Sequence, residues 1–207
     1  MFHGEHRRKR MSNKGHPILL YDVEILRPPP DKKQEPEPDI EYAEGWTDYK
    51  GMDFTMVSAY SYVDQFPRIF FRDNIDEFFQ LLNDHEIFAG FNNIAFDNPL
   101  IEELFGIEIS DEQSFDILLE IREAAGVNKF AKGYNLNNTT KVNLGVGKSG
   151  EGAQAPILWQ RKRYGSVADY GLRDIWLTKG IMDMILEGTP LLDPGSPTDR
   201  IFVKSPV

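Results

Sequence analysis

Apolar and polar positions along the chain predict strands in its first half. Residues 18–25 (ILLYDVEI) form a nearly continuous apolar run, as expected for a central strand that is buried on both faces. Two acids interrupt the end of this run. Shorter segments rich in β-forming residues predict further strands at 56–62, 68–72 and 86–91.

The helical spacing of apolar residues predicts amphipathic helices, which follow most of the predicted strands in the chain. We expect helices at 76–83, 98–105, 114–125 and 166–186, and the last has the longest apolar stripe. Early strands, late helices and alternation between them indicate an α/β domain with a mixed sheet.

Composition divides the chain into a domain and its accessory segments. Residues 1–16 are polar and basic and predict a flexible arm, whereas 188–207 are rich in proline and predict an extended tail. The domain between them spans 17–187. Proline and charge predict a long exposed insertion at about 27–50. Residues 133–156 lack clear periodicity and predict a loop with at most a short helix.

The absence of cysteine and the negative charge narrow the classes of function. Without cysteine, disulfides, thiolate catalysis and cysteine-based zinc sites are excluded, and we expect a reducing, cytoplasmic setting. No apolar run is long enough to cross a bilayer, so we expect no membrane partner and no secretion. A net charge of −10 argues against a passive nucleic-acid binder, but clustered carboxylates can hold divalent ions that meet phosphate.

Two acids on the first strand form the first candidate site. Asp22 and Glu24 are two residues apart, so their side chains project from the same face of the strand. Two carboxylates buried together would repel each other, and a divalent cation between them would remove this conflict. A solvated strand end without function is the alternative.

Two further acids have the sequence context of a site. Asp97 stands at the head of a helix, where it is either a functional acid or an ordinary N-cap. Tyr170 and Asp174 are four residues apart on the last helix and share one face. A buried acid there needs a partner, and an ion pair with Arg173 or Arg161 is the alternative to a functional site.

Taken in order, these clusters resemble the motifs of the DEDD superfamily of 3′→5′ exonucleases, which includes polymerase proofreading domains. The family shows D-x-E on its first strand, G-x-N-x-x-x-F-D before a helix and, in one form, Y-x-x-x-D on its last helix. The matching positions here are Asp22, Glu24, Gly90, Asn92, Phe96, Asp97, Tyr170 and Asp174. The resemblance spans residues 17–187, and stand-alone bacterial or phage exonucleases are also similar.

The resemblance implies an RNase H-like fold, an α/β fold with a mixed sheet of about five strands flanked by helices. It also implies a hydrolase that degrades DNA, as single strands or from 3′ ends, to nucleoside 5′-monophosphates. Asp22, Glu24, Asp97 and Asp174 would hold two Mg²⁺ or Mn²⁺ ions, and Tyr170 would orient the attacking water. Proteins of DNA replication or DNA repair would be its partners, while the oligomeric state stays open.

Candidate substrate contacts lie near the second motif and beyond it. Phe91, Asn92 and Phe96 could stack on a terminal base or form hydrogen bonds with it, although phenylalanine is more often part of a core. Lys148 and Arg161 belong to a basic region in an otherwise acidic chain. That region could follow a phosphate backbone, or it could be an ordinary solvated surface.

Other functions are compatible with the same fold. An RNA-directed exonuclease or an RNase H-like endonuclease would use similar clustered acids, although Tyr170 and Asp174 favour the exonuclease branch. A non-catalytic domain that binds nucleic acid or protein would keep the fold but would not bind paired metal ions.

Overall fold

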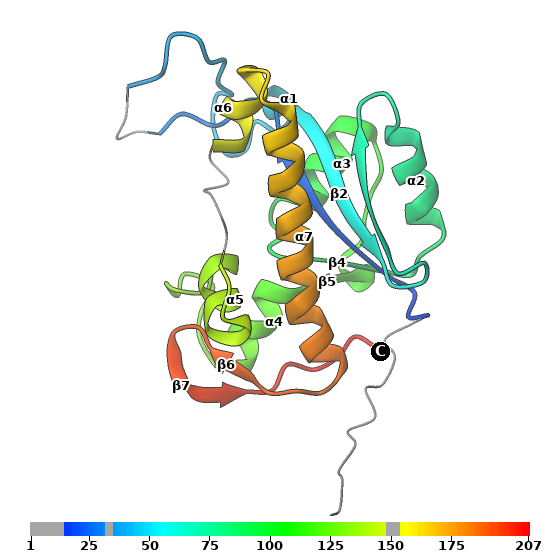
Figure 1. Ribbon diagram of the computed structural model, residues 1–207, viewed down its shortest axis with the longest axis vertical. Helices are drawn as coiled ribbons and strands as arrows, with labels where there is room; N and C mark the ends of the chain where they lie inside the picture. Colours follow the sequence, from blue (N-terminus) through cyan, green and yellow to red (C-terminus); the bar gives the residue numbers. More distant parts are fainter. Residues whose placement is uncertain (1–14, 32–34, 148–153) are drawn as a thin grey trace, which may run out of the picture.

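The structure, a computed structural model, describes residues 15–31, 35–147 and 154–207 (Figure 1). The strands are β1 (Ile18–Ile25), β2 (Phe54–Ser61), β3 (Phe66–Phe71), β4 (Ile87–Gly90), β5 (Ser114–Asp116), β6 (Leu191–Asp193) and β7 (Ser196–Ile201). The helices are α1 (Tyr49–Met52), α2 (Ile75–Asn83), α3 (Asp97–Phe105), α4 (Ile117–Ala124), α5 (Leu136–Leu144), α6 (Ala155–Gln160) and α7 (Tyr164–Leu186), with a 3₁₀ turn at Asp111–Gln113.

Within these residues, the central element is a five-stranded mixed sheet with the order β3-β2-β1-β4-β5. The strands β1, β2 and β3 pair antiparallel, whereas β4 pairs in parallel with both β1 and β5. Helices flank both faces of the sheet. The predicted α/β class with a mixed five-stranded sheet is therefore confirmed, and the topology is consistent with an RNase H-like fold.

Alternation along β1 determines which of its residues face α7. Leu19 and Val23 pack with α2 and α3 in one apolar core, whereas Leu20 packs with α4 and α7 in another. Because side chains alternate along a strand, Asp22 and Glu24 continue the series of Leu20. Figure 1 shows α7 running across this face of the sheet, so the two acids point toward that helix.

The fifth strand is not located by the apolar pattern. The sequence predicts a helix from residue 114, but residues 114–116 pair in parallel with β4 and the helix begins at Ile117. Asp116 accounts for this boundary, because its carboxylate accepts hydrogen bonds from the backbone N–H groups of Leu118 and Leu119. This is the usual role of an N-cap, and it separates strand from helix.

The C-terminal segment, expected to be extended, forms the hairpin of β6 and β7. Leu191 and Ile201 are buried in the same core as residues of α4 and α7. The side chain of Asn143 on α5 accepts a hydrogen bond from the Leu192 backbone at 2.7 Å and donates one to it at 3.0 Å. The hairpin therefore packs against the domain through both apolar and polar contacts.

Two predictions concern residues outside the described part of the chain. The basic arm falls there except for its last two residues, and Lys148 falls there as well. Within the described residues, none of the helices combines the length and the apolar character needed to cross a bilayer.

The close approach of α7 to the sheet depends on Gly171. A Cβ atom at this position would lie 2.3 Å from Cε of Met56 and 2.5 Å from Oγ of Ser58, and both of these side chains are fully buried. We predict that Gly171→Ala lowers the free energy of unfolding by about 1–3 kcal/mol through overpacking, as measured by urea denaturation. Gly165→Ala is the control, because no atom lies within 4 Å of its added Cβ. Equal stability of the two variants would show that α7 does not need this close contact.

Candidate metal centre

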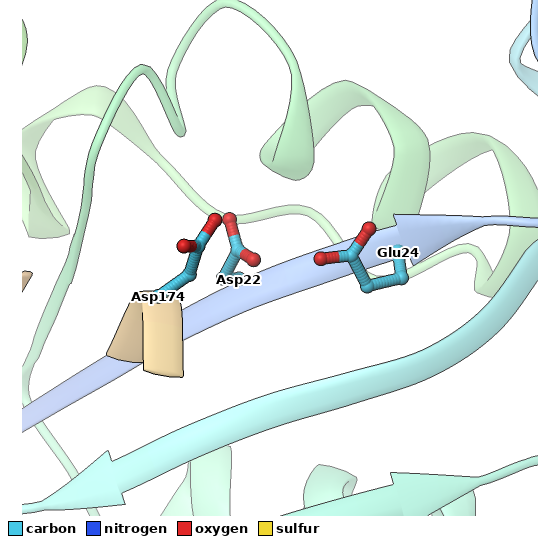
Figure 2. Close-up of side chains that lie close together, drawn as sticks. All are labelled: Asp22, Glu24 and Asp174. Atoms are coloured by element: carbon cyan, nitrogen blue, oxygen red, sulfur yellow. The ribbon is translucent and has the colours of Figure 1, made fainter. Parts of the chain in front are cut away.

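Three carboxylates from two elements converge at one point of the fold (Figure 2). Asp22 and Glu24 come from β1 and Asp174 comes from α7, and their carboxylates turn toward one another. One oxygen atom of each lies within 4.8 Å of the others. Carboxylate oxygens at this spacing can share one divalent cation, because Mg²⁺ and Mn²⁺ prefer oxygen ligands.

Asp97 contacts the same strand from the loop side. The strand β4 pairs with residues 18–20 of β1. Asp97, which follows β4 in the chain, contacts β1 closer to its C-terminal end. Its Oδ1 accepts a hydrogen bond from the backbone N–H of Val23 at 2.8 Å. The N-cap interpretation is wrong, because Asp97 is already the first residue of α3 and Phe96 occupies the cap position. The carboxylate of Asp97 therefore faces the strand that carries the first two acids.

The electrostatics of the site favour a bound cation. Burial, and then the charge of Asp22, raise the pKa of Asp97 well above its ordinary value. A cation among the carboxylates would oppose both effects and stabilise the ionised form. Among the described residues, the lining of the surrounding cavity contains these acids but no lysine or arginine. The donor set therefore fits a hard divalent ion.

Tyr170 lies one helical turn from Asp174, beside the acids. Burial, followed by the charges of Asp174, Glu24 and Asp22, raises the pKa of its phenol far above the ordinary value. The phenol consequently keeps its proton near neutral pH. It can donate a hydrogen bond at this site, but it cannot act as a base.

Arg173 and Arg161 were the possible ion-pair partners of Asp174 in the sequence, and both form ion pairs with other acids. Arg173 pairs with Asp169 on its own helix at 3.5 Å. Nε of Arg161 lies 3.1 Å from a carboxylate oxygen of Asp39 in the Pro-rich insertion. A role of Arg161 in substrate binding stays a prediction.

A cavity of about 300 Å³ surrounds the carboxylates. Each predicted catalytic residue contributes to its lining, and so do Phe91, Asn92 and Phe96 from the loop after β4. Arg161 does not belong to this lining. Clustered carboxylates beside aromatic rings and an amide create a place where a phosphate and a base could lie together.

The loop after β4 is positioned by Asp116, which sequence analysis does not identify. The carboxylate of Asp116 accepts hydrogen bonds from the backbone N–H of Asn92 at 2.9 Å and of Ile94 at 3.3 Å. Asn92 has a positive φ of 74°, which asparagine tolerates better than most residues. An acid directly before the apolar stripe of a helix is the available signal, but the helical periodicity that begins at residue 114 hides it.

The Pro-rich insertion is fastened to α6 by Gln160. The side-chain amide of Gln160 donates to the backbone oxygens of Leu26 at 2.9 Å and Glu41 at 3.0 Å, and it accepts from the Glu41 backbone N–H at 2.8 Å. Arg161 adds ion pairs with Glu37 and Asp39. These contacts hold the insertion beside the end of β1.

This placement brings Trp46 to the cavity, a residue that the sequence analysis also misses. Trp46 is 68% exposed, and its ring meets the ring of Phe96 edge-on with 6.2 Å between centroids. Pro28 and Pro29 from the same insertion line the cavity as well. An exposed tryptophan in a polar segment is the sequence signal that could have identified this wall.

We predict that Asp174→Asn weakens cation binding while the domain stays folded. The substitution preserves side-chain shape but removes a charge and an oxygen ligand, so the Mn²⁺ affinity measured by isothermal titration should fall at least about tenfold. Asp169→Asn alters an exposed acid on the same helix and serves as the matched control. The metal centre would be contradicted if both variants bound Mn²⁺ as tightly as the unmodified protein.

Comparison with known proteins shows a shared fold. No family model matches the chain. No curated protein matches its sequence either. The chain is similar to the structure of the family B DNA polymerase from the hyperthermophilic archaeon Pyrobaculum calidifontis, with a TM-score of 0.56 and 17% identity. The similarity covers 82% of this chain but 24% of the polymerase chain, so this protein corresponds in fold to about a quarter of that polymerase.

Proposed function

We propose that the protein is a metal-dependent 3′→5′ exonuclease that hydrolyses DNA to nucleoside 5′-monophosphates. The supporting observation is that Asp22, Glu24, Asp97, Tyr170 and Asp174 all line one cavity. These residues belong to three separate parts of the sequence, which are the parts that resemble the DEDD motifs. The alternatives were a solvated strand end for Asp22 and Glu24, a helix cap for Asp97 and an ion pair for Asp174. None of these alternatives requires the residues to line the same cavity.

Each residue has a chemical role in the proposed reaction. Asp22, Glu24 and Asp174, with Asp97 beside them, would hold Mg²⁺ or Mn²⁺. Bound ions would neutralise charge on the phosphate and lower the pKa of a bound water. The neutral phenol of Tyr170 would donate a hydrogen bond that orients the attacking water or a phosphate oxygen.

The walls of the cavity favour the end of a strand over its interior. Pro28 and Trp46 from the insertion, Phe96 from the loop and Pro156 from α6 surround the carboxylates. The cavity of about 300 Å³ suits a single terminal nucleotide better than a continuous duplex. This supports exonuclease activity over cleavage within a strand.

The structural similarity favours DNA as the substrate. One solved protein that shares the fold is a DNA polymerase, and the superfamily that the motifs resemble includes polymerase proofreading domains. Because the similarity covers 24% of the polymerase chain, we do not propose that this protein synthesises DNA.

The proposal is tested by digestion of 3′-labelled single-stranded and double-stranded DNA and RNA, with and without Mg²⁺. We predict that Mg²⁺ releases the label from DNA as mononucleotides, and that Asp22→Asn slows this release at least about 10³-fold. Oligomeric products would indicate an endonuclease, and preferential loss of RNA would indicate an RNA-directed enzyme. Mn²⁺ binding without hydrolysis of any substrate would contradict the proposed activity.

We predict that Tyr170→Phe lowers kcat about 10–100-fold because the orienting hydrogen bond is lost. Its affinity for Mn²⁺ should be unchanged, since the carboxylates remain. The phenol stays protonated, so the ratio of the two rates should be constant between roughly pH 6 and pH 9. A ratio that varied with pH would show that Tyr170 titrates during the reaction.

We predict that Trp46→Ala raises KM for single-stranded DNA about tenfold, because it removes an aromatic wall beside the carboxylates. Trp46→Phe retains a ring and should restore most of the affinity. The measurement is steady-state kinetics on the same oligonucleotide. A change in kcat at constant KM would assign Trp46 to a role other than base binding.

A further inference from the structure

A second cavity is lined by residues that lie close in sequence to those of the carboxylate cavity. It measures about 450 Å³, and its lining includes Leu26, Phe54, Phe71, Arg72, Trp159 and Tyr164. In two places, a residue that lines one cavity is followed closely in the sequence by a residue that lines the other. Ile25 lines the first and Leu26 the second, and on α6 Pro156 lines the first and Trp159 the second.

Aromatic rings form much of the wall of this second cavity. Phe71 stacks against Trp159 with 5.9 Å between ring centroids and 28° between ring planes. Tyr164 lies against the same tryptophan at 4.6 Å and is 48% exposed. Phe71 and Trp159 are half-buried, so Tyr164 is the exposed ring of the three. Accessible ring faces stack on nucleobases of any sequence, since every base has a π-face.

Positive side chains border these rings. Arg72 is exposed, lies 4.8 Å above the ring centroid of Phe54 and pairs with Asp53. Lys162 and Arg163 occupy exposed positions in the segment that connects Trp159 to Tyr164. The lining itself contains Arg72 and the acid Asp73, so Arg72 and the exposed Lys162 and Arg163 are the cations available to phosphates attached to stacked bases.

We propose that this second cavity binds an internal nucleotide of the same single strand whose 3′ end occupies the carboxylate cavity. The base would stack on Trp159 and Tyr164, and the phosphate would meet Arg72 or the basic segment. This proposal rests on the proposed exonuclease function. Two contacts on one strand bind more tightly than either contact alone, so substrate length decides whether the second cavity contributes.

The test compares kcat/KM for a dinucleotide with kcat/KM for an oligo(dT) of about 16 nucleotides, a length at the upper end of typical single-strand sites. The unmodified protein should prefer the long substrate. Trp159→Ala should lower kcat/KM on the long substrate about tenfold and leave the dinucleotide rate unchanged. Trp159→Phe, which keeps a ring, should restore the preference for length.

Two further variants separate binding from folding. Tyr164→Ala removes a ring that is 48% exposed, so it should reproduce the loss without disturbing the core. Trp176→Ala removes a ring that is 49% exposed on α7 and lines neither cavity, so it should keep the response to length. If Tyr164→Ala and Trp159→Ala both kept the unmodified preference for length, the second subsite would be refuted.

Binding without divalent metal distinguishes this proposal from the exonuclease function. Fluorescence anisotropy of labelled oligo(dT) in the presence of a chelator should show weaker binding for Trp159→Ala and Tyr164→Ala than for Trp176→Ala. Equal affinities among these three variants would contradict the second subsite. Absence of hydrolysis by the unmodified protein would contradict only the exonuclease function.

Discussion

The contact between α7 and the second half of β1 is the constraint on which the candidate site depends. Apolar residues such as Ile175 and Ile181 hold the helix on the sheet, and Gly171 allows it to come close to β2. This packing brings Asp174 toward Asp22 and Glu24 although like charges repel. Apolar burial along the helix therefore maintains an acidic cluster that its own electrostatics would separate, and a divalent cation is the ligand that suits such a cluster.

Polar contacts between distant segments complete the cavity around these acids. Asp97 accepts a hydrogen bond from the backbone N–H of Val23. Asp116 accepts one from the backbone of Asn92 and so holds the loop that connects β4 to α3. Gln160 holds the Pro-rich insertion, which places Trp46 in the cavity wall beside Phe96. Each of these residues satisfies backbone groups of another segment, so loops that lack secondary structure of their own still have defined positions.

The arrangement explains how an acidic chain could act on a polyanion. A basic groove is not required if metal ions meet the phosphate at the reaction centre and aromatic rings bind the bases. Both cavities have aromatic residues in their linings, and in the proposed reaction a phosphate would lie beside these rings in each of them. Cations outside the carboxylate cavity, such as Arg72, would then contact phosphates away from the reacting bond.

The apolar run at 18–25 and the helical periodicity at 166–186 were sufficient to predict β1 and α7, and with them the shared faces of Asp22 with Glu24 and of Tyr170 with Asp174. These faces follow from the geometry of a single strand and a single helix. Other features were decided by tertiary structure alone. The strand β5 is too short to show a period, Asp97 finds its partner 74 positions away, and Trp46 reaches the cavity because α6 holds the insertion. A local sequence pattern indicates which side of one helix or strand is buried. Contacts between separate elements depend on packing across the whole fold.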